Sequence, residues 1–403
     1  MEQTKPTKGY LNYISLLFFL AYGFIMLDAN GVTFFSDILM EELHITAAQY
    51  SSLNSAIWCT KAVSSIVVGI LADRSGLRKV FVSPLLFVAG ALSILTAFSN
   101  SFILILCMRF VWGLCVGATL SMLVSIVSKN LIRNDLGARS GFISCGSAVI
   151  ASTLGPMLLT QVVLRFTWRG SFVLTGASIL IIAFLIQFTV KEVHCEKINN
   201  QAGANAFVSS VFELARNRSF MLCLLIGVFE CAGKLTISIF GPLYLTEIMS
   251  VDPTTKGNLL SAMGLIYIPV SFIIPALADR FSAKKVMLIT FLLCLITPLS
   301  MVLMEGRAIS IATLVLFGNW AAATVSLFIY VIPGRALPEH LIGTANGIIM
   351  GVSVFVGGCV CPLILGKFAD SVQGIRDIMW ACSAMFMLCI LLTAFLKENK
   401  KKA

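Results

Sequence analysis

The sequence predicts an all-α membrane protein with twelve transmembrane helices in two pseudo-symmetric six-helix bundles. Hydrophobic residues make up 58% of the 403-residue chain and charged residues only 12%, with a mean hydropathy of +0.95. Soluble domains carry about 25% charged residues. Most apolar runs reach about 20 residues, the length a helix needs to cross a bilayer. A third observation is an internal repeat, because residues 69–79 recur in altered form as residues 275–285.

The two copies are offset by 206 residues, and this one register holds over more than a hundred residues. It pairs Leu71, Ala72, Asp73, Arg74 and Lys79 with Leu277, Ala278, Asp279, Arg280 and Lys285. It also pairs Pro156 with Pro362, and we expect both prolines to bend their helices. Such a register indicates a duplicated six-helix unit. We therefore predict an N-terminal bundle at 1–190, a cytoplasmic linker at 191–218 and a C-terminal bundle at 219–403.

The predicted helices follow the apolar runs in order. In the first half they span 10–35, 47–72, 80–98, 102–128, 139–163 and 170–190. In the second half they span 219–246, 256–278, 285–304, 309–333, 343–366 and 375–396. The linker between them begins polar and then places apolar residues of 207–214 at helical spacing, which predicts a short amphipathic helix.

The basic residues predict the orientation in the membrane. If the N-terminus is cytoplasmic, most of the 29 Lys and Arg residues fall in segments on the inner side. This positive-inside pattern predicts a multi-pass protein of the cell membrane, plasma or inner, with both termini cytoplasmic. The net charge of +10 then reflects topology and attraction to anionic lipid of the bilayer. It does not indicate nucleic-acid binding, because the basic residues are scattered over short loops.

Catalytic and metal-binding patterns are missing from the sequence. Eleven of the twelve cysteines lie in predicted apolar helices, and the three histidines lie near predicted surfaces. No His or Cys spacing typical of a metal site occurs, and no nucleophile–base pair lies in the membrane. We predict a protein that is not an enzyme and that uses no cofactor and no metal.

The segment from Gly69 to Lys79 closely resembles the signature of the major facilitator superfamily, G-x-L-A-D-R-x-G-x-R-K. The resemblance implies a cytoplasmic gate in which the Asp73 carboxylate faces the start of the eleventh helix, near Gly343. The predicted gating residues are Gly69, Asp73, Arg74, Gly76, Arg78 and Lys79, with the repeat copies Asp279 and Arg280. The alternative is that the basic residues here serve only as topology signals.

Charged residues inside the predicted helices are candidates for function because burying a charge in a bilayer is costly. They are Asp28, Lys61, Arg109, Glu230 and Lys234. The repeat makes Asp28 and Lys234 equivalent, and Glu230 lies one helical turn before Lys234. The alternatives are a water-exposed end of the first helix for Asp28, a purely structural Glu230–Lys234 pair, and snorkelling of the basic side chains.

Three of these five charges are basic, which favours an anionic substrate. Asp28 and Arg109 also resemble residues of the organic anion:cation symporter branch, although Ala29 and Val116 depart from its pattern. We predict that the substrate contacts Lys61, Arg109, Lys234, Asn30, Asn54, Trp58, Tyr267 and Asn319. We predict that Asp28 or Glu230 carries a coupled proton, with Asp28 preferred.

The sequence therefore predicts a secondary active transporter of a small organic anion, a carboxylate. It would work as a monomer by alternating access, with proton symport. The first alternative is an exporter of drugs or metabolites, and the second is a transporter-like sensor.

Overall fold

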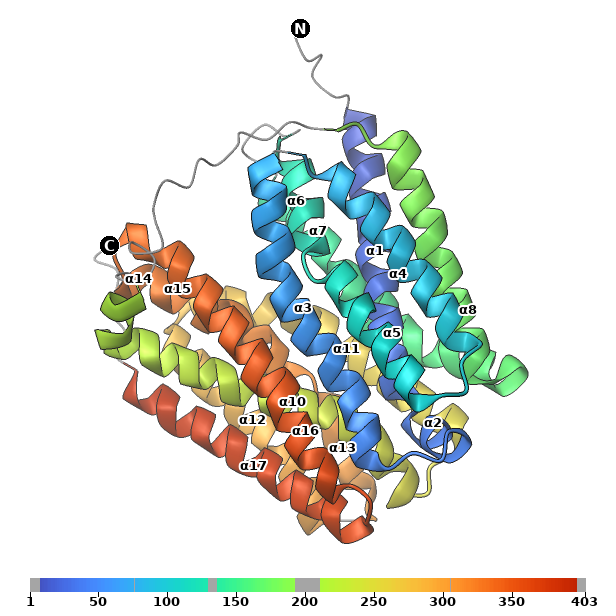
Figure 1. Ribbon diagram of the computed structural model, residues 1–403. Coiled ribbons are helices and arrows are strands. Elements are labelled where there is room, and N and C mark those ends of the chain that lie inside the picture. Colours follow the sequence, from blue (N-terminus) through green and yellow to red (C-terminus); the bar gives the residue numbers. More distant parts are fainter. Residues whose placement is uncertain (1–7, 76, 130–135, 193–210, 305, 397–403) are drawn as a thin grey trace, which may run out of the picture. The chain divides into compact units, whose positions relative to one another are not determined.

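The computed structural model describes residues 8–75, 77–129, 136–192, 211–304 and 306–396 (Figure 1). Within these ranges the chain is almost entirely helical, with no β-strand element. Its contacts divide the chain into two compact units, treated separately below. Unit 1 comprises Met1–Ile45 and Ala56–Asn199, and unit 2 comprises Thr46–Ser55 and Asn200–Ala403.

Unit 1 contains the helices of the first half of the chain, except that residues Thr46–Ser55, which include the start of α3, group with unit 2. They are α1 (Lys8–Phe34), α2 (Ser36–Glu42), α3 (Ala47–Ser75), α4 (Lys79–Ala97), α5 (Phe102–Val116), α6 (Thr119–Lys129), α7 (Leu136–Gly146), the π-helix η1 (Ser147–Leu154) and α8 (Gly155–Thr189). α8 breaks at Phe166 and Thr167, whose backbone dihedral angles are not helical. The second part of α8 runs beside α4 (Figure 1).

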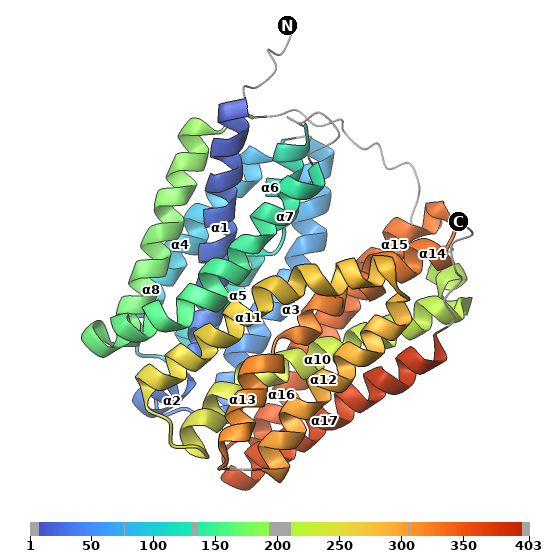
Figure 2. The same ribbon diagram turned by 180° about the vertical axis from the view of Figure 1, so that it is seen from behind.

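Unit 2 contains the helices of the second half. They are α10 (Arg218–Glu247), α11 (Pro253–Arg280), α12 (Ala283–Leu303), α13 (Ala308–Phe317), η2 (Trp320–Thr324), the π-helix η3 (Leu327–Val331), α14 (Ile332–Ala336), α15 (Glu339–Val352), the π-helix η4 (Ser353–Val360), α16 (Cys361–Leu365), η5 (Gly366–Phe368) and α17 (Val372–Phe395). α17 packs beside both α10 and α12 (Figure 2). Residues 211–216 of the predicted linker helix are helical, whereas 207–210 lie outside the described residues.

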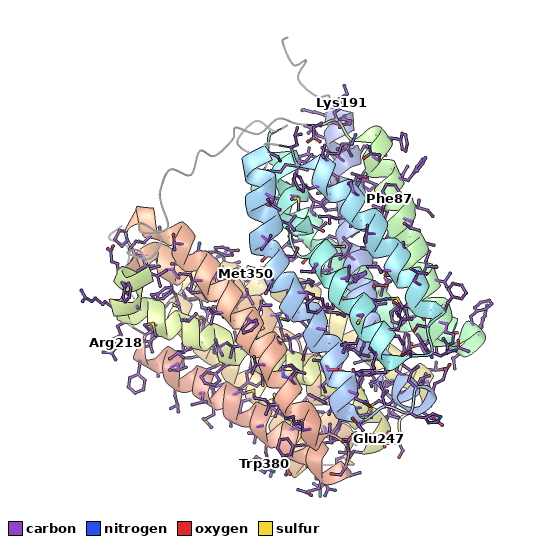
Figure 3. The ribbon with its side chains drawn as sticks, in the orientation of Figure 1. Phe87, Lys191, Arg218, Glu247, Met350 and Trp380 are labelled. Atoms are coloured by element: carbon purple, nitrogen blue, oxygen red, sulfur yellow. The ribbon has the colours of Figure 1, made fainter. Side chains whose placement is uncertain are left out.

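The predicted twelve-helix arrangement is confirmed. Ten helical stretches of the described chain are long and apolar enough to cross a membrane, and one of them, Arg139–Thr189, contains the break in α8. Splitting that stretch and adding the 29-residue α3 gives twelve. Large apolar side chains on these helices are exposed, as lipid contact requires, including Ile103. Another is Trp380 on α17 (Figure 3).

Short polar side chains fix where several helices of unit 2 begin. The side-chain oxygen of Asn217 accepts hydrogen bonds from the first backbone N–H groups of α10. Asp252 does the same for α11, Ser282 for α12 and Ser371 for α17. Such caps satisfy N–H groups that have no partner within the helix. Arg218 and Glu247 mark the two ends of the capped α10 in Figure 3.

Two of the π-helices occupy equivalent positions in the repeat. η1 begins at Ser147 and η4 begins at Ser353, which is 206 residues later. Each is followed by a proline in the second position of the next helix, Pro156 and Pro362. Because proline has no N–H group, it cannot complete the α-helical hydrogen bond to the carbonyl four residues before it. Each proline expected to bend its helix therefore directly follows a run of wide π turns, and both features are common causes of helix kinks.

Candidate functional site

Three helices of unit 1 bring a buried acid, a buried base and a hydroxyl together. The Nη1 atom of Arg109 on α5 lies 2.6 Å from the Oδ2 atom of Asp28 on α1. The hydroxyl of Thr175 on α8 donates to the Oδ1 atom of the same carboxylate at 2.6 Å. Both charged side chains are 0% exposed. Asp28 and Arg109 therefore neutralise each other, and both oxygens of the carboxylate are occupied.

Aromatic rings surround the Arg109 guanidinium. Its central carbon lies 4.4 Å from the ring centroid of Phe172 and 5.7 Å from that of Trp112. Such cation–π contacts contribute about 0.5–2 kcal/mol each. The Nε and Nη2 atoms of Arg109 are buried and have no hydrogen-bond partner among the described residues. The aromatic packing leaves this edge of the guanidinium closed to solvent.

Lys61 on α3 is a buried cation of a different kind. Its side chain is 9% exposed, and its Nζ atom lies 3.6 Å from the sulfur of Met26 and 4.6 Å from the ring centroid of Trp58. In the described part of the chain, no carboxylate lies within ion-pair distance of this ammonium group. A thioether is only a weak hydrogen-bond acceptor. The desolvation of Lys61 is thus poorly compensated by the protein, and an anion would compensate it.

Close helix packing fixes the position of Lys61. Gly113 and Gly117 of the α5–α6 stretch lie against α3, and a Cβ atom at Gly117 would overlap the backbone of Lys61. At Gly113 an added Cβ atom would overlap the side chain of Thr60. The hydroxyl of Ser64, one turn after Thr60, also donates to the backbone of the α5–α6 stretch. Glycines four residues apart permit this approach, and it holds the Lys61 backbone rigidly.

Unit 2 contains a buried acid on α10. Glu230 is 2% exposed, and its Oε1 atom has no hydrogen-bond partner in the part of the chain that the structure describes. Lys234, one turn later, is partly buried and lies within electrostatic range of Glu230. The neighbouring glycines Gly227 and Gly233 pack tightly against η4 and α17. Glu230 therefore lies on a stretch of α10 that is enclosed by the interior of unit 2.

The other predicted substrate contacts are distributed over both units. Asn30 and Trp58 are partly buried in unit 1. Asn54 is 2% exposed and belongs to the first part of α3, which groups with unit 2. Tyr267 on α11 and Asn319 before η2 are partly buried in unit 2. Their roles stay predictions.

The predicted gate is described only in part. Gly76 lies outside the described residues, as do the side chains at positions 69, 73, 74 and 279, and Arg280 is exposed. At the start of α4, the backbone N–H groups of Arg78 and Lys79 donate to the Oε1 atom of Glu192 at 3.0 and 3.1 Å. The N–H group of Val80 donates to its Oε2 atom at 3.1 Å. Glu192 thus caps α4 with a carboxylate, which the helix dipole favours.

Sequence reasoning missed Glu192 because it placed this residue in an irregular linker. It also missed a cluster at the opposite end of unit 1. There Glu42 accepts hydrogen bonds from the indole N–H of Trp168 and from Arg169, each at 2.6 Å. Arg169 also donates to the backbone oxygens of Ala97 and Ser99. An arginine in a predicted outer loop, where basic residues are few, was the available signal for this cluster.

A model of the Major Facilitator Superfamily matches residues 18–362, and a second match covers residues 229–402. The chain belongs to the Major Facilitator Superfamily. The second match begins within α10, in agreement with the duplication of the chain. Membership makes this a multi-pass membrane transporter and not an enzyme.

Curated relatives of the chain differ in what they carry. The chain is 26% identical over 282 residues to the multidrug resistance protein MdtL of Klebsiella pneumoniae, covering 68% of this chain and 67% of MdtL. It is 25% identical over 191 residues to the probable sulfoacetate transporter SauU of Cupriavidus necator, covering 47% and 43%. It is 22% identical over 391 residues to a putative proline/betaine transporter of Staphylococcus haemolyticus, covering 91% and 81%.

Solved structures share the fold at low sequence identity. A variant of the nucleoside transporter NupG matches with a TM-score of 0.82 and 14% identity, covering 95% of this chain and 100% of that chain. A bacterial homologue of the human lysosomal transporter Spinster matches with a TM-score of 0.78 and 14% identity, covering 99% and 100%. At this identity the likeness extends to the fold alone.

Proposed function

We propose that this protein is a secondary active transporter that carries a small organic anion by alternating access, together with a proton. The observation that carries the proposal is the buried Lys61 ammonium, which has a thioether and an aromatic ring beside it in place of a carboxylate. A carboxylate or sulfonate oxygen would form a charge-assisted hydrogen bond with it, about twice as strong as a neutral one. Among the residues that the structure describes, unit 1 buries two cations, Arg109 and Lys61, and Lys61 is the one without a carboxylate partner.

For the coupled proton we now favour Glu230 over Asp28. Asp28 accepts one charge-assisted hydrogen bond from Arg109 at Oδ2 and one hydroxyl bond from Thr175 at Oδ1, so both carboxylate oxygens already have partners within the protein. Glu230 is buried, and no described residue forms a hydrogen bond with its Oε1 atom. Protonation of Glu230 would remove a buried negative charge, and this supports a role as the proton-carrying group. The gating role of Asp73 and its neighbours is proposed on the signature alone.

The proposal includes the cell membrane as location, both termini in the cytoplasm, and a monomer as the working form. The distribution of Lys and Arg along the chain supports the cytoplasmic position of the termini. The similarity to SauU supports an anionic substrate. The similarity to MdtL favours a second candidate, the export of drugs or metabolites.

A transport assay separates the two candidates. The purified protein is reconstituted into proteoliposomes, and accumulation of labelled carboxylates, sulfonates and a cationic dye is measured with inward and outward proton gradients. We expect an inward gradient to drive accumulation of an anion. We expect Lys61→Met to abolish this accumulation, whereas the same change at the exposed Lys367 leaves it intact. Gradient-driven movement of the dye alone, with no anion uptake, would favour the exporter.

The proton role has its own test in the same vesicles. Glu230→Gln should abolish uphill accumulation and spare exchange of anion between equal concentrations, because the binding cation remains. Full uphill accumulation by Glu230→Gln would assign the coupled proton elsewhere or replace symport with another driving force.

A further inference from the structure

We propose that the substrate is a monoanion with an apolar body, bound through one carboxylate or sulfonate group at Lys61. This inference rests on the proposed anion transport. The site that carries it consists of Lys61, Trp58 and Met26, here called the Lys61 site.

The buried charges of unit 1 indicate how many negative charges a ligand can carry. The membrane-spanning helices of this unit bury Asp28 and Arg109, which cancel as an ion pair, and Lys61, which has no carboxylate partner among the described residues. These three side chains therefore sum to one positive charge. A ligand with one negative charge brings the sum to zero. A second negative charge would be buried without compensation, which is costly in a medium of low dielectric constant.

Arg109 cannot serve as the partner of a second negative charge on the ligand. Its Nη1 atom is bonded to Asp28, and the guanidinium is covered by the Phe172 ring. Its side chain is 0% exposed, so its unpartnered Nε and Nη2 atoms face closed packing. Lys61 is the more accessible of the two cations, and its single positive charge can neutralise one acid group of a ligand.

The groups beside the Lys61 ammonium favour an apolar ligand body. The ammonium of Lys61 touches a thioether and an indole ring, which are polarizable and lack strong hydrogen-bonding atoms on the sides they present. A hydroxyl or amine group of the ligand placed against this thioether or this ring face would lack a strong hydrogen-bond partner there. An added ammonium group would also be repelled by Lys61. The site therefore selects an apolar body over a sugar acid or a zwitterion.

Met26 is a weak internal partner of Lys61 that a ligand can displace. The Met26 sulfur lies 3.6 Å from the Lys61 Nζ atom, and a sulfur acceptor holds a donor less tightly than an oxygen does. Exchange of this contact for a sulfonate or carboxylate oxygen therefore gains a stronger bond. Met26 keeps the ammonium group in place without competing with the ligand.

Three matched probes test the inference on the purified full-length protein. Butane-1-sulfonate is a monoanion, 4-sulfobutyrate adds a second negative charge, and 4-aminobutane-1-sulfonate adds a positive charge to the same chain. Sulfonates stay ionised at all working pH values, so charge is not confounded by protonation at that group. Binding is measured by isothermal titration calorimetry. We expect the monoanion to bind at least ~30-fold more tightly than either other probe, a difference of about 2 kcal/mol.

Variants at the site complete the test. Lys61→Met should remove monoanion binding, Lys61→Arg should retain part of it, and Lys367→Met should leave it unchanged. Because the ranking of the probes is measured on the unaltered protein, the inference is tested even if a Lys61 variant fails to fold. Lys61-dependent binding of the dianion at equal or greater strength would overturn the monoanion inference and leave anion transport standing. Anion binding that is indifferent to Lys61→Met would overturn both.

Discussion

Removal of the acid from the buried ion pair of unit 1 should destabilise the protein strongly. In Asp28→Leu the guanidinium of Arg109 would stay buried at 0% exposure with no counter-charge, and its Nη1 atom would join the two nitrogen atoms that already lack partners. Removing one partner of a buried pair costs about 3–5 kcal/mol. For a unit of this size, each kcal/mol lowers the unfolding midpoint by about 2–4 °C. The expected decrease is therefore roughly 6–20 °C.

The double variant Asp28→Leu/Arg109→Met separates the charge from the packing. It removes both charges and keeps apolar volume, so its unfolding midpoint should recover most of the loss. The midpoints are measured on purified protein in one detergent by thermal unfolding, and Lys367→Met serves as the control for handling. A single variant as stable as the unaltered protein would refute the buried pair. A double variant as unstable as the single one would show that packing, and not charge, causes the loss.

Three further predictions concern packing, capping and pH. Gly113→Ala should strongly reduce the yield of folded protein in size-exclusion profiles, whereas Gly141→Ala should be tolerated, because an added Cβ atom overlaps neighbours at the first position and meets nothing at the second; equal yields would contradict the close packing of α3. Glu192→Gln should lower stability by about 0.5–1 kcal/mol through loss of the charged cap of α4, and the exposed Glu213→Gln should not; equal unfolding midpoints would remove this role. Hydrogen bonds from Thr255 lower the pKa of Asp252 below its ordinary value of 3.8. Its contribution to stability is therefore complete above that value and is lost as the pH falls through the lowered pKa, so Asp252→Asn should flatten the acid limb of the stability curve. A curve identical to that of the unaltered protein would contradict the cap at Asp252.

The fold could be predicted from the sequence because hydropathy and the repeat act over long stretches. Apolar runs fixed the twelve spans, and the predicted gap between 163 and 170 contains the break at Phe166 and Thr167. The signature at residues 69–79 indicated the family that the comparison then showed. The matched prolines indicated where the helices would depart from regular α-helical geometry. They did not indicate that π-helices would form there, because a proline is compatible with several local geometries.

The site could be predicted only as a set of residues. All three charged side chains of the unit 1 site were named, because charge in an apolar helix is conspicuous. Their pairing was not predicted, since helices that are apolar on every side give no signal of which face meets which neighbour. Asp28 and Arg109 therefore looked like independent groups, and Lys61 did not stand out among the cations. Glu192 was missed because its role depends on a contact more than a hundred residues away in sequence.

The central claim is that the transported anion binds at Lys61, and exchange transport tests it most directly. Proteoliposomes are loaded with unlabelled butane-1-sulfonate, and entry of the labelled compound is followed with no proton gradient, so that coupling does not enter the result. We expect rapid exchange by the unaltered protein and by Lys367→Met, partial exchange by Lys61→Arg, and no exchange by folded Lys61→Met. Exchange by Lys61→Met at the rate of the unaltered protein would contradict the central claim.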